Sequence, residues 1–346
     1  MRQHFAYQAL LALLLTAALA GCQREPLPES GGAISFSVAP VTISGEVTKA
    51  ATKADPTAKT DLVAVDKKVT VYGSYTAAGS SVALFDGVEL KCTEVSGTGS
   101  TWTYSPLKYW SEDATHKFRA VYPYNAADKS YSVADDKLTI SNYSMATGYD
   151  LMVASAQQPA ASRESNTETL KFRHACAAVR LLFGKGGSDT QTYSIKNFTL
   201  QNIYKTGTLN YVGASKNIDV DISEWTPGAR EASAFVWTNS DGWSVPAPTT
   251  EVPFNPTDDC EWLFVVPQEL TVTGTDTAPT LSLTYMAGSQ EMHVTLPLVS
   301  DNSTIKKWLP GKMYTYKVLL NPNAIKLSVG WTDWPTETVH SFAPIG

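Results

Sequence analysis

Apolar and polar residues alternate in short runs along most of the chain, and turn residues separate the runs. Leu281, Leu283 and Tyr285 share one phase of this alternation, and the apolar residues of 292–298 do the same beyond the turn Ala287-Gly288-Ser289. A period of two places successive side chains on opposite faces of a strand, so two such runs around a short turn predict a hairpin. No convincing amphipathic helix is found. The pattern therefore predicts an all-β chain of β-sandwiches, built from roughly twenty short strands.

The alternation changes phase once within an otherwise continuous apolar stretch. Leu170 and Phe172 occupy one phase, whereas the apolar residues of 179–183 occupy the other. A strand can change its buried face only through a bulge, a bend or a change of sheet. We place that change at 174–177. His174 lies on the apolar phase there, which favours a buried structural histidine, hydrogen-bonded to the backbone, over a catalytic one.

The N-terminus has the pattern of an export signal. Arg2 precedes an apolar run over 9–22, which is too short to cross a bilayer core as a permanent helix. Its last four residues, 19–22, read LAGC and resemble a bacterial lipobox, in which the signal is cut before the cysteine and the thiol carries lipid. The pattern predicts a signal peptide at 1–21 and a lipidated Cys22. The alternative is an ordinary signal peptide with a chance cysteine.

Composition shifts divide the rest of the chain. Residues 22–32 hold two prolines and two glycines and predict a flexible tether. Residues 33–47 begin with an alternating run that predicts a half-buried strand, and the polar, lysine-rich 48–60 predicts an exposed loop. The polar, proline-containing stretch 157–169 is our candidate domain boundary. The predicted domains are an N-terminal sandwich at 33–160 and a C-terminal sandwich at 161–346.

Charge and cysteine content narrow the functional classes. The chain has 346 residues and a net charge of -6, with no basic patch for nucleic acid. Besides Cys22 the cysteines are Cys92, Cys176 and Cys260, which are single and far apart. An oxidising compartment would allow one disulfide and leave one thiol over, and the sequence does not choose the pair. Buried free thiols are the favoured interpretation.

The sequence shows no catalytic or cofactor motif. No two histidines stand at metal-ligand spacing, and HExxH, GxSxG, P-loop and GxGxxG patterns are missing from the sequence. We therefore predict no enzyme activity, no cofactor and no metal site; the paired aspartates favour exposed loop charge over a calcium site. Trp237 and Trp243 flank a polar turn and could contact a glycan, although rim or core positions in a sandwich are favoured.

Several segments, taken in order, resemble the fimbrillin (Mfa-like) proteins of Bacteroidales, the subunits of type V pili. Ser111 stands where the family usually has proline. Together with the lipobox, the matching segments are TKA at 48–50, WTYSPLKYWSEDATHKFRAVYPY at 102–124, DLMVA at 150–154, LKFRHACA at 170–177, IKNFTLQNIYKTGTL at 195–209, WLPGKMYTYKVLL at 308–320 and VGWTDW at 329–334.

This resemblance implies two transthyretin-like β-sandwich domains in tandem and a lipoprotein route to the outer membrane and cell surface. It also implies a polymer with other pilus subunits, built by exchange of a strand between neighbours. Residues 33–47 would be the strand that fills the groove before assembly, and Lys49, Lys53 or Lys59 the site of a maturing cut.

Two alternatives stay open within this interpretation. No arginine lies between Arg24 and Arg119, which departs from subunits cut by arginine-specific proteases. An uncut tip or anchor subunit is therefore an alternative to a stalk subunit. A surface lipoprotein that binds glycans and does not polymerise is the alternative from a different class.

Overall fold

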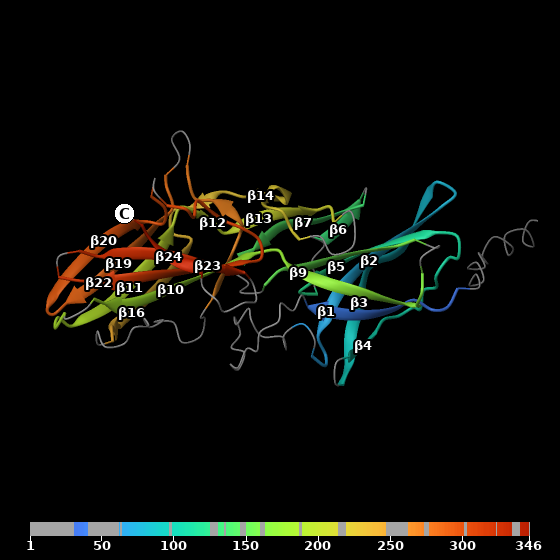
Figure 1. The fold of residues 1–346 in the computed structure, drawn as a ribbon, viewed down its shortest axis with the longest axis horizontal. Coiled ribbons are helices and arrows are strands. Elements are labelled where there is room, and N and C mark those ends of the chain that lie inside the picture. The colour runs from blue at the N-terminus through green and yellow to red at the C-terminus, as the bar shows by residue number, and fades with distance from the viewer. Residues whose placement is uncertain are drawn as a thin grey trace, which may run out of the picture.

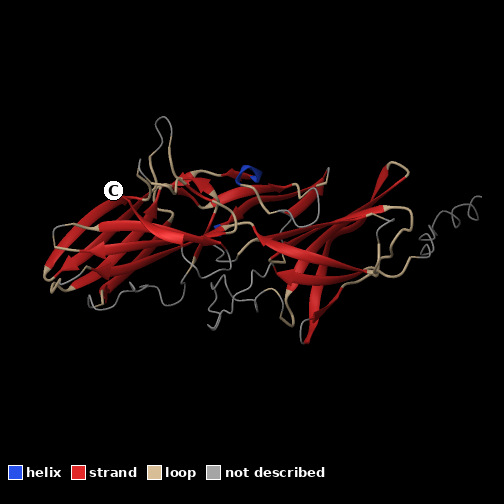
Figure 2. Ribbon diagram, in the orientation of Figure 1, coloured by secondary structure: helices blue, strands red, loops and turns tan. Residues whose placement is uncertain are grey.

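Strands make up nearly all the regular structure of this protein (Figure 2). The computed structural model describes residues 31–40, 62, 64–96, 99–124, 131–134, 136–145, 150–159, 163–186, 189–213, 219–246, 262–272, 277–300, 303–322, 324–333 and 340–345. Apart from short turns such as the 3-10 helix η3 (Ile222–Glu224), these residues form β-sheets. The all-β prediction is confirmed.

A seven-stranded sheet forms one end of the molecule (Figure 1). Its neighbours pair antiparallel, except that its edge strand β1 runs parallel to β9. The sheet curls, so that β1 also lies next to the opposite edge strand β4. In spatial order the strands are β1 (Ser35–Pro40), β9 (Thr167–His174), β8 (Met152–Gln158), β5 (Thr115–Tyr122), β2 (Lys68–Ala77), β3 (Ser80–Ser96) and β4 (Gly99–Thr103).

A four-stranded sheet packs against the outer face of β2, β5 and β8 through a cluster of buried apolar side chains. Because this sheet covers the second face of β5, Arg119 and Val121 are buried as well as Phe118 and Ala120. The strands are, in order, β14 (Trp225–Pro227), β13 (Thr206–Tyr211), β7 (Lys137–Ser144) and β6 (Tyr131–Ala134).

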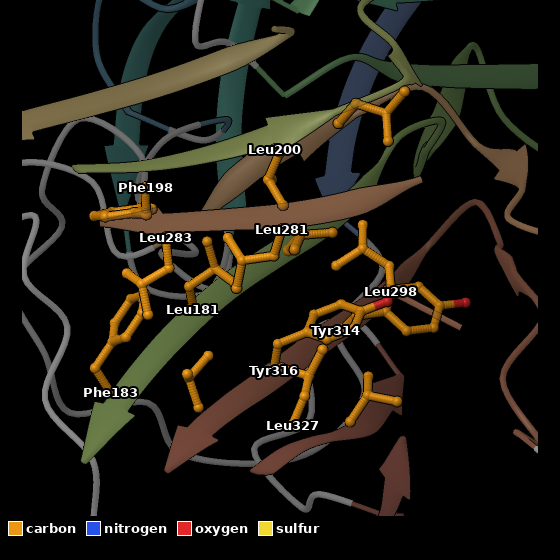
Figure 3. Close-up of a cluster of buried hydrophobic side chains, with 14 of the residues drawn as sticks. Leu181, Phe183, Phe198, Leu200, Leu281, Leu283, Leu298, Tyr314, Tyr316 and Leu327 are labelled. Atoms are coloured by element: carbon orange, nitrogen blue, oxygen red, sulfur yellow. The ribbon is translucent and has the colours of Figure 1, made fainter. Parts of the chain in front are cut away.

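At the other end, a five-stranded and a four-stranded sheet enclose a third core. Leu181 and Phe183 from one sheet meet Phe198, Leu281 and Leu283 from the other, as Figure 3 shows. The five strands are β17 (Leu263–Val265), β10 (Ala177–Lys185), β22 (Lys312–Leu320), β23 (Lys326–Asp333) and β24 (His340–Ile345); the four are β16 (Phe235–Ser244), β11 (Tyr193–Gln201), β19 (Thr280–Ala287) and β20 (Gln290–Pro297).

Two short strand pairs complete the described structure. The pairs are β12 (Ile203–Tyr204) with β15 (Arg230–Glu231), and β18 (Gln268–Glu269) with β21 (Lys307–Trp308).

The predicted hairpin is confirmed. Its strands β19 and β20 pair antiparallel up to Ala287 opposite Gln290. Gly288 turns the chain with a φ of 61°, a left-handed conformation that glycine adopts without strain.

The predicted change of phase is a change of sheet. β9 ends at His174 in the seven-stranded sheet, and β10 begins at Ala177 in the five-stranded sheet. Between them, the N–H of Ala175 donates to the carbonyl of Leu151 at 2.8 Å, and the N–H of Gly311 donates to the carbonyl of Cys176 at 2.8 Å. Two distant segments therefore hold the bend.

Strands from both sides of position 160 share sheets. β8 and β9 are neighbours in the seven-stranded sheet, although the candidate boundary 157–169 lies between them. β13, from the second half of the chain, pairs with β7, from the first half. The polar, proline-containing stretch 157–169 thus begins in β8 and ends in β9, which are adjacent strands of one sheet.

Candidate assembly site: the first strand and its groove

The first strand buries one face completely. Ile34, Phe36 and Val38 are only 1%, 4% and 5% exposed, while Ser35 and Ser37 between them are half-buried. This alternation confirms a half-buried strand at the start of 33–47, of which the described part ends at Pro40.

Backbone hydrogen bonds hold this strand on both sides at its start. Along one side it runs parallel to β9, from Ser35 opposite Thr167 to Pro40 opposite Phe172. On the other side, the N–H of Ile34 donates to the carbonyl of Lys108 at 2.8 Å. β1 therefore lies in a groove between β9 and the segment that follows β4.

Phe36 fills an aromatic pocket in the middle of the groove. Its ring meets those of Phe118, Phe85 and Tyr104 edge-on, at centroid distances of 5.3, 5.5 and 5.9 Å. The Tyr104 hydroxyl also donates to the carbonyl of Ile34 at 2.7 Å. Edge-to-face contacts of this kind contribute about 0.5–1.5 kcal/mol each beyond simple burial.

On the outer face, hydroxyl pairs join β1 to β9. Ser35 Oγ lies 2.6 Å from Thr167 Oγ1, and Ser37 Oγ lies 2.9 Å from Thr169 Oγ1. A shift by one residue would bring the apolar side chains to this face and place the hydroxyls in the core. The hydroxyl pairs and the aromatic pocket thus specify one register.

The three buried side chains of β1 contribute much of its attachment to the sheet. Burying a large apolar side chain contributes about 1.5–3 kcal/mol, so Ile34, Phe36 and Val38 together contribute roughly 5–9 kcal/mol. If β1 left, the rings of Phe85 and Phe118 and the unpaired edge of β9 would face water. An unpaired strand edge above an apolar pocket is a template for another strand.

A buried histidine supports the entrance of the groove. The indole N–H of Trp110 and the N–H of Ser35 both donate to the carbonyl of Asn166, at 3.0 and 2.9 Å. Beneath Trp110, the His116 ring lies edge-on at a centroid distance of 4.7 Å and accepts a hydrogen bond at Nε2 from the N–H of Ser111. Burial lowers the pKa of His116 to about 4.

Several residues singled out from the sequence lie outside the described residues. They are Cys22, Lys49, Lys53, Lys59 and Cys260. Lipidation and the maturing cut therefore stay predictions.

Cys92 and Cys176 are both buried and both carry free thiols. Burial raises the pKa of each thiol. Neither thiol is therefore set up to react, and both side chains fill core space.

Trp237 and Trp243 lie half-buried on β16 and pack on the core between the two C-terminal sheets. Trp237 stacks on Phe198 at a centroid distance of 4.7 Å, and Trp243 meets the same ring at 5.6 Å. Part of the surface of each indole is thus already in contact with the protein core. Glycan contact at these residues stays a prediction.

The sequence predicted a buried His174 that is hydrogen-bonded to the backbone, and it gave no side-chain partner. The structure places His174 Nδ1 2.6 Å from a carboxylate oxygen of Asp150, and both side chains are largely buried. The two residues belong to separate matched segments, DLMVA and LKFRHACA. The presence of both segments in the chain was the one available sequence signal for this pair. Nothing within either segment indicates that the two side chains are in contact.

The described residues contain no cluster of three or more histidine, cysteine, aspartate or glutamate side chains placed to hold a metal ion. Within the same part of the chain, no helix is long and apolar enough to cross a membrane.

The chain belongs to a family of all-β surface proteins. The family model described as fimbrillin-like matches residues 48–334, which is most of the chain, so the protein is a member of the fimbrillin-like family. It is a fimbrial protein of that family, and a structural protein rather than an enzyme. No curated relative matches the chain.

Solved structures share the fold. A fimbrial protein from Bacteroides vulgatus is 15% identical with a TM-score of 0.54, over 87% of this chain and 99% of the other. A protein described as a cell-adhesion protein from Bacteroides ovatus is 12% identical with a TM-score of 0.52, over 90% of this chain and 100% of the other.

Proposed function

We propose that this protein is a pilus subunit that is exported as a lipoprotein and joins other subunits by donor-strand exchange at the β1 groove. The observation that carries the proposal is β1 itself. A short edge strand near the N-terminus supplies three buried side chains to the core, and the lysine-containing stretch 48–60 comes shortly after its end at Pro40. A strand in that position can leave its groove after a single cut, without breaking the rest of the sheet.

We also propose that the molecule comprises two transthyretin-like sandwich domains. In this interpretation the seven-stranded sheet and the β6–β7–β13–β14 sheet form the first domain, and the two C-terminal sheets form the second. Strands β9, β13 and β14 then belong to the first domain, although they follow position 160.

The maturing cut would fall at Lys49, Lys53 or Lys59, and lipid on Cys22 would hold the chain at the outer membrane until then. The partners are other pilus subunits, each inserting a strand into the groove of the next. If no cut occurs, the lipid keeps the subunit at the membrane as an anchor, with β1 in place.

A peptide-exchange experiment tests the groove directly. A specific protease site is inserted between Lys49 and Lys59, and fluorescent peptide 33–40 is added to cut and uncut protein. We expect uptake by the cut protein alone. A peptide with Phe36→Ala should bind about tenfold more weakly or worse, because its aromatic pocket stays empty. A Ser37→Ala peptide is the matched control and should lose much less.

The N-terminal residue of the chain found in assembled fibres distinguishes a stalk subunit from an uncut tip or anchor subunit. Mass spectrometry of assembled surface fibres should find this subunit beginning within 50–60. An intact N-terminus with lipidated Cys22 in the fibres would rule out the stalk role. Failure of the cut protein to take up any peptide would rule out strand exchange at this groove.

A further inference from the structure

A cavity of about 410 Å³ lies between the β2–β3 hairpin and the β6–β7 hairpin, over β5. Its volume falls in the range of small-molecule sites. Its lining combines apolar side chains such as Phe85 with polar groups. The polar groups are the hydroxyls of Ser74, Thr76 and Ser81, the carboxylates of Asp86 and Asp136, and the cations of Lys117 and Arg119. No residue of β1 lines the cavity, although Phe85 borders both the cavity and the aromatic pocket around Phe36.

Arg119 is the unusual residue of this lining. Its place in the alternation puts it opposite Phe118 and Ala120, on what the sequence indicates is a polar face, yet it is only 4% exposed. One terminal nitrogen donates to the carbonyl of Phe118 at 2.9 Å, and the other donates to the carbonyls of Asp136 and Val212 at 3.0 and 2.8 Å. Its Nε is buried without a hydrogen-bond partner.

The guanidinium therefore lacks a bonded counter-ion. In the described part of the chain its hydrogen bonds go to neutral carbonyls, while the carboxylate of Asp136 pairs with Lys117 instead. Burial lowers the pKa of Arg119, and the nearby Tyr211 and Asp136 oppose that shift. A buried cation is costly unless an anion and full hydrogen bonding compensate it, and guanidinium geometry suits a carboxylate.

The walls favour a ligand with several hydroxyl groups. Ser74, Thr76 and Ser81 make no side-chain hydrogen bonds to the described residues, so their hydroxyls are available to a ligand. Asp86 is exposed and can accept from a hydroxyl. A bare inorganic anion or a simple carboxylate would leave most of these groups unused.

We propose that this cavity binds an acidic monosaccharide unit, a uronic or sialic acid, with its carboxylate on Arg119 and its hydroxyls on Ser74, Thr76, Ser81 and Asp86. Such a site gives the subunit an adhesive contact of its own. It does not depend on strand exchange, so either proposal can fail while the other stands. It also differs from the Trp237 and Trp243 positions on β16, whose indoles pack on the C-terminal core.

Matched sugars test the site on the full folded chain. Binding of three acidic sugars is measured by calorimetry or ligand-observed NMR: glucuronate, galacturonate and N-acetylneuraminate. The controls are glucuronate methyl ester, glucose and acetate. The methyl ester keeps the hydroxyls and removes the charge, whereas acetate keeps the carboxylate and lacks the hydroxyls. We expect at least one acidic sugar to bind about tenfold or more tightly than all three controls, because a hydrogen bond to a charged group contributes about 1.5–3 kcal/mol.

Variants then locate the binding. Arg119→Gln should reduce the affinity for the acidic sugar to that of the methyl ester. Because Arg119 is buried and its variant could fail to fold, Ser74→Ala with Ser81→Ala provides a second test and should weaken binding about tenfold. Lys91→Gln, outside the cavity, is the control and should bind as wild type. Equal binding of acid and ester, wild-type affinity in the folded variants, or no binding of any acidic sugar would overturn the proposal.

Discussion

Individual contacts at the bend between β9 and β10 connect segments that are far apart in the chain. His174 meets Asp150, and the indole N–H of Trp225 donates to the carbonyl of Ala175 at 2.8 Å. Gly311 reaches the same bend through its N–H to Cys176. Three of the matched segments, DLMVA, LKFRHACA and WLPGKMYTYKVLL, thus meet where the chain passes from one sheet to the next. The residues named here in these segments therefore serve the packing and hydrogen bonding of this junction rather than a catalytic reaction.

The contact between Asp150 and His174 should be measurable as a coupling. Asp150→Ala and His174→Ala should each destabilise the protein, and the double variant should lose less than the sum. The expected coupling is about 1–3 kcal/mol by urea unfolding, because both groups are largely buried. The exposed pair Glu291 and His293, 3.1 Å apart, provides the control, with about 0.5 kcal/mol or less. Equal couplings in the two pairs would contradict the structural role.

His116 should make stability depend on pH. Its pKa is lowered to about 4 by burial, whereas the unfolded chain has the ordinary value near 6.5. Between these values the unfolded state binds the extra proton, so stability falls as the pH drops from about 6.5 to about 4, by up to roughly 3 kcal/mol.

A histidine variant measures that contribution. Urea unfolding of wild type and His116→Gln at pH 7 and pH 4.5 should show a smaller loss on acidification in the variant, whatever its stability at pH 7. His293→Gln controls for removing a histidine elsewhere. The same pH dependence in His116→Gln as in wild type would disprove this role.

At the scale of elements, the alternation predicted strands well and their partners poorly. The β19–β20 hairpin and the break between β9 and β10 follow from local phase, because a two-residue period fixes which face is buried. The parallel pairing of β1 with β9 joins residues more than 120 positions apart. No local pattern encodes such a contact. The burial of Arg119 does not follow from a local pattern either, because a sheet built from distant segments covers its face.

The candidate site was predictable only in part. The phase of Ile34, Phe36 and Val38 predicted a half-buried strand, and the family resemblance supplied its role. The aromatic pocket around Phe36 was not predictable, since Phe85, Tyr104 and Phe118 come from different parts of the sequence.

Strand β2 has a position, Gly73, where two aromatic rings leave little space for a side chain. Its register with β3 shifts on both sides of Gly73. A Cβ there would lie 2.8 Å from a ring carbon of Phe85 and 2.9 Å from one of Phe118, and both rings are buried. Gly73→Ala should therefore cost about 1–3 kcal/mol in urea unfolding. Ser80→Ala, at an exposed position at the start of β3, is the control and should change stability little. Equal stabilities of the two variants would show that the rings move aside freely.

At the scale of the whole molecule, the three cores are linked into one structure. The middle cluster contains Val121 and Val153 from the seven-stranded sheet, Leu209 from β13, and Phe264 and Met313 from the five-stranded sheet. The sheets at the two ends therefore share a common core through the β6–β7–β13–β14 sheet. We expect the described structure to unfold as a unit rather than as two independent halves, because loss of either end exposes this cluster.

Cutting the gene at the polar stretch 157–169 tests that expectation. A fragment of residues 33–160 keeps β6 and β7 but lacks their partner β13, and it keeps β8 without β9. Two strand edges and the buried face of Leu138 and Ile140 would then meet water. The fragment should give a poorly dispersed NMR spectrum and no cooperative thermal transition, whereas the full chain gives a single transition by calorimetry. A second fragment, 33–230, restores β9, β13 and β14 and should recover part of the dispersion. A well-dispersed, cooperatively melting 33–160 fragment would show that the first half folds without strands from the second.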